Sequence, residues 1–137
     1  GCSDEEYENF RKQKKPKTVM YEAFGEKFPI QLKVDKYSMT GNLAIEMVNW
    51  KHRYPSSWAA LTVDLNEVCE KDCSYVDTNH HGRKILSWII ENGLGELTGQ
   101  RNRSGYCTYE KIRFYPEKLK DCDPEGYQRY KIKFEET

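Results

Sequence analysis

The fold is decided by the stretch Leu43-Ala44-Ile45-Glu46-Met47-Val48, in which large apolar side chains occupy every second position. Successive side chains of a β-strand point to opposite faces, so these large residues share one face of the strand. The alternation therefore predicts a strand with one buried face. The turn signal Thr40-Gly41-Asn42 directly precedes it.

Similar strand signals lie on both sides of this stretch. Residues 20–24 and the alternating residues 30–35 flank Gly25-Glu26, a pattern that predicts a hairpin. After a loop that contains Pro55, residues 58–65 alternate again. Strands this close along the chain are expected to pair antiparallel, as a meander.

The hydrophobic period changes between Asn79 and Asn92, where Ile85, Trp88 and Ile89 recur at helical spacing. We predict one helix over residues 79–92. Thr78 or Asn79 can cap its start, and Asn92-Gly93 supplies a left-handed stop.

The glycine-rich residues 93–105 are expected to form a loop, followed by strands over 106–115 and 127–135, where apolar and polar side chains alternate. The predicted fold class is thus α+β, with an antiparallel sheet of five or six strands packed on the helix 79–92. Residues 20–137 are predicted to form a single domain, and residues 1–19 a charged arm that is flexible or a short helix. The expected core comprises Ile45, Leu61, Val63, Ile85, Ile89, Ile112 and Phe114.

Composition places the chain among globular proteins, because 37% of its 137 residues are hydrophobic. Lys plus Arg and Asp plus Glu number 22 each, so no global field favours nucleic acid or an anionic membrane. Without a long apolar run, we expect a soluble, cytoplasmic protein. The start Gly1-Cys2-Ser3 leaves two alternatives open, a lipid anchor on Cys2 or a remnant of a tag.

Six blocks of the sequence together resemble a family of short bacterial proteins that share a domain of unknown function, often encoded near conjugative elements or phages of gut bacteria. The resemblance covers about residues 40–115. It implies a cytoplasmic accessory protein of a mobile element, and it assigns no catalytic residue. The blocks are residues 42–45, 61–65, 75–79, 91–95, 98–99 and 104–109.

A polar cluster directly precedes the predicted helix. It could combine one histidine with Cys69 and Cys73 in a zinc site, but no second tight pair of ligands completes the set, so we expect neither a metal nor a cofactor. The alternative interpretation is a helix cap beside solvated histidines. The cluster consists of Asp77, Asn79, His80 and His81.

Five cysteines form an odd set, which favours free thiols. Cys107 with a histidine and Asp77 or Asn79 would be the minimum arrangement for thiol catalysis, so a small thiol-dependent or metal-dependent hydrolase remains an alternative. A lone cysteine in a strand is more often a small buried apolar residue. We lean towards a protein that is not an enzyme.

The predicted loop is the expected binding surface, because polar groups between rigid elements are free to contact a partner. Arg101, Asn102, Arg103 and Tyr106 are its candidate binding residues. We predict a non-enzymatic binding or accessory module whose partner is a protein; a single-stranded nucleic-acid-binding module is the next alternative, and the oligomeric state stays open. The second alternative rests on aromatic residues (Tyr106, Tyr109, Phe114, Tyr115, Tyr127, Tyr130) interleaved with basic ones (Arg101, Arg103, Lys111, Arg113, Arg129).

Overall fold

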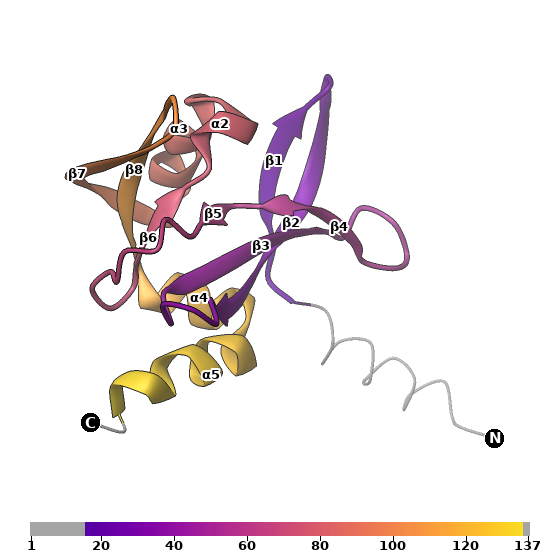
Figure 1. Cartoon of the computed structure of the whole chain (residues 1–137). Coiled ribbons are helices and arrows are strands. Elements are labelled where there is room, and N and C mark those ends of the chain that lie inside the picture. Colours follow the sequence, from indigo (N-terminus) through magenta and orange to yellow (C-terminus); the bar gives the residue numbers. More distant parts are fainter. Residues whose placement is uncertain (1–15, 136–137) are drawn as a thin grey trace.

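A computed structural model describes residues 16–135 of the chain (Figure 1). The first half of these residues forms the predicted antiparallel meander. The hairpin and the strand that follows it are confirmed, with Leu32 opposite Met47 and Val34 opposite Ile45 in the register. This sheet has the strand order β1-β2-β3-β4, made of β1 (Val19–Ala23), β2 (Glu26–Lys36), β3 (Leu43–Asn49) and β4 (Ser56–Ala60).

A second antiparallel sheet follows, so the expectation of one sheet with five or six strands is wrong. The α+β class is confirmed, but the described strands divide into two sheets of four. The sequence showed no sign of the strand β6, which is buried along its whole length and therefore does not alternate. The second sheet has the order β5-β6-β8-β7, made of β5 (Thr62–Val63), β6 (Cys73–Val76), β8 (Cys107–Phe114) and β7 (Gly95–Ser104).

The two sheets meet at Leu61, between β4 and β5. Its backbone N–H donates to Ile45 O in the first sheet, and its carbonyl accepts from the N–H of Asp77, directly after β6 of the second sheet, both at 2.9 Å. The register of β3 with β4 also shifts between Met47 and Val48, inside the paired stretch that ends with Ala60 opposite Glu46. Apolar and polar residues alternate without a break across this crossing, and for that reason residues 58–65 were predicted to form one continuous strand.

The predicted helix 79–92 is two helices, α2 (Thr78–His81) and α3 (Lys84–Glu91). Gly82 separates them, because its φ of 78° and ψ of 170° cannot continue a helix. The predicted stop is confirmed by Gly93, whose φ is 64°. Trp88 packs into the core as expected, edge-on against Tyr21, and its Nε1–H donates to Met20 O at 2.8 Å.

The prediction of a C-terminal strand over residues 127–135 is wrong, since the chain there forms α4 (Pro116–Cys122) and α5 (Pro124–Glu135). Each helix begins with a proline, whose fixed φ suits the first helical turn. Tyr127 and Tyr130 are buried three residues apart, on one helical face.

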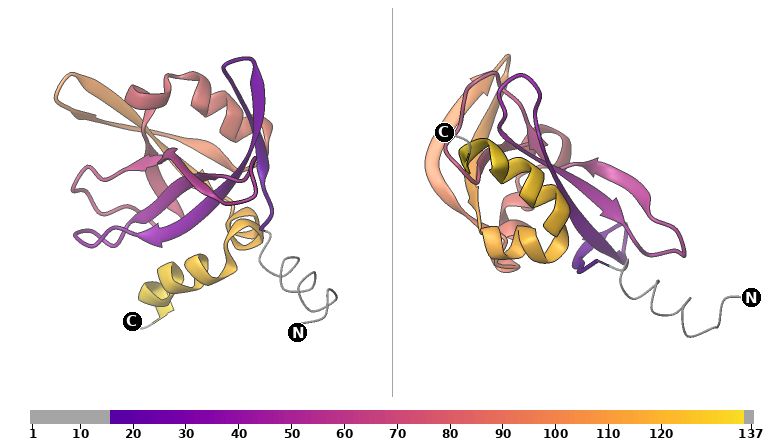
Figure 2. Two further views of the ribbon diagram at one scale, coloured as in Figure 1. Left: turned by 90° about the vertical axis from the view of Figure 1, so that its right-hand side faces the viewer. Right: turned by 90° about the horizontal axis from the view of Figure 1, so that it is seen from below.

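Helices α4 and α5 cover the edge of β2 that β1 leaves open (Figures 1 and 2). Pairing with β1 ends at Ile30, so the next residues of β2 need other partners. Asp123 accepts from Val34 N–H at 3.0 Å, and Gln31 donates to Cys122 O at 2.9 Å. Gly126 lies directly against Val34 O, where a Cβ atom would clash.

The main core lies between the two sheets and the helices. Six of the seven predicted core residues are buried there; Val63 is half-buried and packs instead in a second small cluster around Cys69, Cys73 and Tyr75. Of the predicted arm 1–19, only residues 16–19 are described, and Cys2 lies outside the described residues. No helix in residues 16–135 is long and apolar enough to cross a membrane.

The turn of the β1–β2 hairpin holds an aromatic residue in a left-handed conformation. Phe24 and Gly25 have φ angles of 54° and 74°, and two such residues in a two-residue turn are typical of type I′. Apart from glycines, the only other described residues with positive φ are Asn66 and Asp72, types that tolerate it. Phe24 is 90% exposed, so no packing offsets the cost of its conformation.

We therefore expect Phe24→Asn to stabilise the protein by about 1 kcal/mol, because asparagine is favoured at this turn position. The melting temperature should rise by about 4 °C in a thermal unfolding experiment. Phe24→Ala is the matched control, since it removes the ring but keeps a Cβ at positive φ and should give a smaller gain. A lower melting temperature for Phe24→Asn would contradict the strain argument.

Candidate functional site

The segment predicted as the binding loop is mostly a strand. Residues 95–104 form β7, which pairs with β8, and the register shifts between Leu97 and Arg101. β7 is the last strand of its sheet, and most of its polar residues are exposed. It therefore lacks the alternation of apolar and polar residues by which a strand is recognised in a sequence. Gly95 is buried, and a Cβ there would lie 2.7 Å from Arg113 O, which explains one of the four glycines by close packing.

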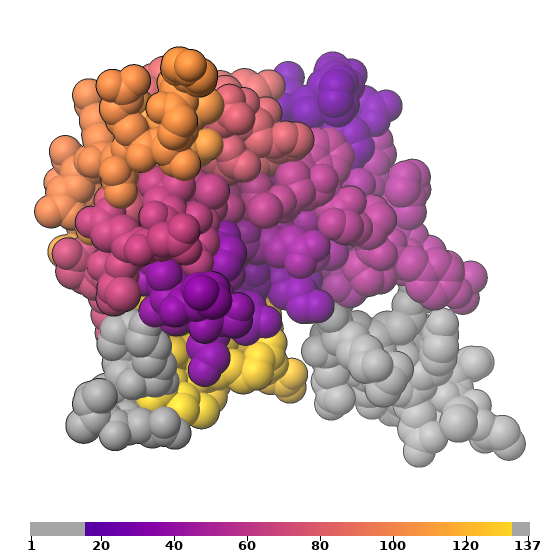
Figure 3. Space-filling model, in the orientation of Figure 1, coloured from indigo at the N-terminus to yellow at the C-terminus, as the bar shows by residue number. Residues whose placement is uncertain are grey.

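The exposed part of this hairpin is its turn. Ser104 pairs with Cys107, and Gly105 adopts a φ of 63° in the turn between them. Tyr106 is fully exposed, at 101% of its reference area. Arg103 is exposed too, and its guanidinium has no ion-pair partner among residues 16–135. We call residues 103–106 the hairpin tip; the hairpin projects at the upper edge of the molecule, coloured orange in Figure 3.

Arg101, a second predicted binding residue, is used within the fold. It pairs across the strands with Glu110, and its Nε forms an ion pair with Glu110 Oε1. The Glu110 side chain is 5% exposed, on the strand face that also carries Ile112 and Phe114, whereas that of Arg101 is 65% exposed. Oε1 has no directed hydrogen bond, so Arg101 is the group that compensates this buried charge.

Asn102 is also engaged in structure. Its Nδ2 donates to Glu67 Oε2 at 2.8 Å, and its Oδ1 accepts from the backbone N–H of Arg103 at 2.8 Å. Tyr75 OH donates to the same Glu67 oxygen at 2.7 Å. Asn102 therefore ties β7 to the segment between β5 and β6, and of the four predicted binding residues only Arg103 and Tyr106 are free for a partner.

Lys111, one of the basic residues that suggested nucleic-acid binding, lies beside this tie and is buried, which the sequence did not predict. Lys111 is 3% exposed, and its Nζ donates to Glu70 Oε2 at 3.1 Å and to Gln100 Oε1 at 2.8 Å. The Nζ also lies 5.5 Å from the centre of the Tyr75 ring. The Glu70 carboxylate, the Gln100 side-chain oxygen and the Tyr75 ring together stabilise the charge of this ammonium group, so we interpret Lys111 as a structural residue. Its burial could have been predicted from its place in β8, because it lies two residues from the buried Tyr109 and therefore on the same face of the strand.

The predicted polar cluster caps a helix. Asp77 accepts from His80 N–H at 3.1 Å, and Asn79 is exposed. His81 donates from Nε2 to Ala60 O at 2.7 Å, while the two histidine rings stand edge to face. No group of three or more His, Cys, Asp or Glu side chains in residues 16–135 is placed to hold a metal ion.

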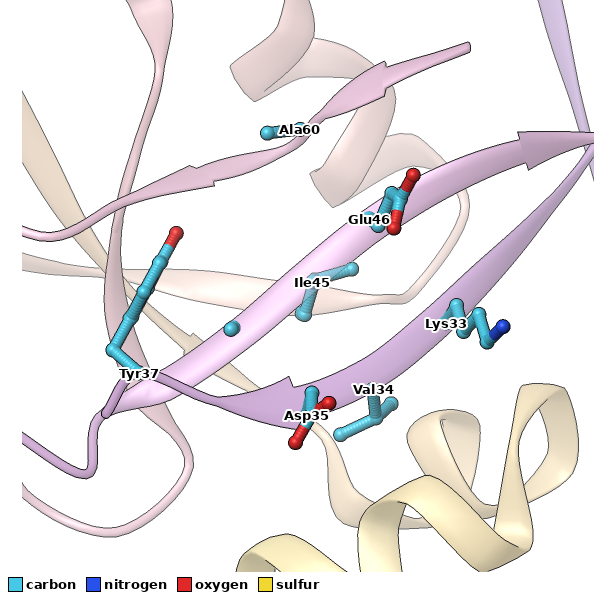
Figure 4. A pocket seen from close by; sticks show the side chains of 8 residues that line it. Lys33, Val34, Asp35, Tyr37, Ile45, Glu46 and Ala60 are labelled. Carbon is cyan, nitrogen blue, oxygen red and sulfur yellow. The ribbon is translucent and has the colours of Figure 1, made fainter. Parts of the chain in front are cut away.

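An open hollow of about 370 Å³ lies on the first sheet, over β2 and β3 (Figure 4). Lys33 and Glu46 line it from paired positions on the two strands, and Tyr37 OH at one end is hydrogen-bonded to Thr62 Oγ1 at 2.8 Å. Glu46 is also bonded to Ser57 at 3.1 Å. The mixture of charges and the existing bonds give no convergent set of groups for a ligand.

The aromatic platform expected for nucleic acid does not form. Four of its six aromatic residues are buried, and Arg101, Lys111 and Arg113 face carboxylates. Bases cannot stack on rings inside a core. The four buried residues are Tyr109, Phe114, Tyr127 and Tyr130.

Two neighbouring arginines should differ sharply in their contribution to stability. Arg101→Ala is expected to cost about 1–3 kcal/mol of unfolding free energy, because it leaves the buried Glu110 carboxylate uncompensated. Arg103→Ala should stay within about 0.5 kcal/mol. Urea unfolding checks both, and Glu110→Leu added to Arg101→Ala should restore part of the loss. Equal effects of the two arginine substitutions would contradict the buried-charge assignment.

Comparison with known proteins gives one match. A family model described as "Domain of unknown function (DUF4313)" matches residues 31–134, which adds α4 and most of α5 to the range of the resemblance inferred from residues 40–115. No curated protein and no solved structure matches the chain. The model covers well over half of the sequence, and the chain therefore belongs to the DUF4313 family.

Proposed function

We propose that this chain is a non-enzymatic binding module that contacts a protein partner through the hairpin tip. The observation that carries the proposal is the full exposure of Tyr106 beside the unpaired Arg103, on a turn held by two paired strands. Tyrosine and arginine are enriched among the residues that dominate protein–protein binding energy. The strands on either side position both groups before a partner arrives, which lowers the entropic cost of binding.

A protein partner is favoured over single-stranded nucleic acid by the charge balance. The formal net charge of zero and the sequence pI of about 7.0 provide no general attraction for phosphates. Arg101 and Lys111 are neutralised within the fold, so Arg103 is the free cation of the hairpin tip. The hairpin tip itself presents one exposed ring, which is too few for successive stacked bases.

Three of the four described thiols are buried and give a thiol-dependent hydrolase no support. Cys107, the thiol considered as a nucleophile, is half-buried against the cluster around Cys69, Cys73 and Tyr75. Burial raises the pKa of Cys69 to about 11, and burial also raises the pKa of Cys73 and that of Cys122. Thiols with raised pKa values are protonated at neutral pH, whereas nucleophilic catalysis requires the thiolate.

The partner of the proposed module is inferred, from the family resemblance, to be a protein of a bacterial mobile element in the cytoplasm. Anchoring through Cys2 would place the same module at a membrane instead.

Cys69 should react slowly with alkylating reagents while the protein is folded. With a pKa of about 11, only about one thiol in a thousand is ionised at pH 8, which is roughly 200-fold less than for an unperturbed thiol. Timed iodoacetamide labelling, followed by peptide mass spectrometry of the Cys69 peptide, measures the rate, and labelling in urea is the control. A rate that rises about tenfold per pH unit, without levelling off near pH 9, is expected, and labelling within minutes at pH 7 would contradict the protonated assignment.

The double variant Arg103→Ala, Tyr106→Ser tests the proposed function. Both side chains are exposed, so the melting temperature should change by less than about 1 °C while captured protein partners are lost. Affinity capture from the native host at low and high salt compares wild type and variant. Tyr54→Ser is the matched control, because Tyr54 is an exposed tyrosine on the β3–β4 connection.

Three results of that capture contradict the proposal. One is an unchanged set of partners in the double variant. Another is a steep loss of binding with salt together with recovery of nucleic acid, which would favour the nucleic-acid alternative. The third is an equal loss of partners with Tyr54→Ser.

A further inference from the structure

A second exposed aromatic residue stands at the same end of the molecule as the hairpin tip. The turns of the β1–β2 and β7–β8 hairpins both project at the end that carries α2 and α3, and two views at right angles agree on this (Figures 1 and 2). Hydrogen bonds tie both hairpins to the helices between them. Trp88 on α3 donates to Met20 O in β1, and Thr78 on α2 donates to Thr108 O in β8 at 3.4 Å.

Phe24 occupies the turn of the first hairpin, and Tyr106 the turn of the second. Both rings are almost wholly exposed, and each lies next to a glycine with positive φ. Phe24 itself adopts a left-handed conformation that disfavours a bulky residue and that asparagine would adopt at lower cost. A costly residue whose ring is almost wholly exposed points to a role outside the fold.

Free cations lie on α3 and at the second turn, while the two glutamates beside the first turn face lysines: Glu26 forms an ion pair with Lys51, and Glu22 lies opposite Lys27 in the register. Arg83 and Lys84 begin α3, and neither has an ion-pair partner among residues 16–135; Arg103 adds a third free cation at the second turn. α3 has no acidic residue in its first turn, although acidic residues are favoured there by the helix dipole. Glu91, at the far end of α3, is its one carboxylate.

We propose that the two hairpin turns and α3 form one docking surface for an acidic protein segment, with Phe24 and Tyr106 as its two apolar anchors. This inference rests on the proposed function, and it adds the second anchor and the chemistry of the partner. Carboxylates of the segment face the cations at the start of α3, and its apolar side chains cover the two rings. Complementary charge of this kind fixes orientation and speeds association, while buried aromatic anchors supply most of the affinity.

The test uses the full ¹⁵N-labelled chain and a defined acidic probe. The probe is a peptide of about 12 residues with a repeating Glu-Glu-Leu sequence, which extends to roughly 40 Å. A repeating Lys-Lys-Leu peptide and an oligothymidine of similar length are the comparison ligands. Amide chemical-shift titration locates the contacts and gives the Kd for each ligand.

Binding of the acidic peptide should shift amides in both turns and at the start of α3. Phe24→Asn and Tyr106→Ser should each raise its Kd about fivefold or more, because each removes one anchor. Phe24→Asn keeps the hairpin turn, so unfolding cannot account for the loss, and its melting temperature verifies this. Tyr54→Ser should leave the Kd unchanged.

Different results separate this inference from the proposed function. If Tyr106→Ser weakens binding but Phe24→Asn does not, the proposed function stands and the two-anchor surface is wrong. If Phe24→Asn weakens binding but Tyr106→Ser does not, both are wrong, because the hairpin tip is then not a contact. Tighter binding of the basic peptide or of oligothymidine, or no binding of the acidic peptide, overturns the acidic protein partner.

Discussion

Leu61 is hydrogen-bonded through its backbone to both sheets, since its N–H donates to Ile45 O and its carbonyl accepts from Asp77 N–H. The chain therefore passes from one sheet to the other without leaving a buried backbone group unpaired. The buried Leu61 side chain enters the main core at the same point. Because β4 and β5 are consecutive along the chain, the two sheets cannot slide apart, and their apolar faces close on each other.

The closure at Leu61 determines what the helices must do. A bent arrangement of two sheets leaves a gap between β1 at one end and β7 at the other, and α3 occupies it with the buried stripe of Ile85, Trp88 and Ile89. α4 and α5 complete the core from the other side, where their tyrosines are buried and Asp123 satisfies the open edge of β2. The exposed edge that remains, β7, is protected by its register shift and its charged residues, features that discourage pairing with another strand.

The sequence predicted correctly those elements whose apolar residues follow a single period, either that of a strand or that of a helix. Alternation found β1 to β3, and helical spacing with Gly93 found the buried stripe and the end of α3. The passage of the chain between the sheets at Leu61 could not be predicted, because alternation places Leu61 and Val63 on the same face of one strand. In the structure Leu61 packs in the main core, and Val63 packs against the small cluster around Cys69, Cys73 and Tyr75. At the C-terminus a signal was present but was not used: Pro116 and Pro124 are typical of helix starts, whereas the prediction of a strand over residues 127–135 followed the alternation alone.

The candidate site shows why composition alone does not separate binding residues from structural ones. Arg101, Asn102 and Lys111 have the chemistry of a binding surface, yet each compensates a group of the fold: the buried Glu110, the Glu67 carboxylate and the Glu70 carboxylate. Residues that are free for a partner have the opposite property: their conformation or charge destabilises the fold, and no contact within residues 16–135 offsets that cost. Phe24 adopts a left-handed conformation that is otherwise left to glycine, Asn66 and Asp72 among the described residues, and the two cations at the start of α3 stand where α4 and α5 carry glutamates. Phe24 and the cations of α3 lie at the same end of the molecule (Figures 1 and 2). Selection for stability alone would have removed such features, since a single substitution of Phe24 by asparagine relieves its backbone strain.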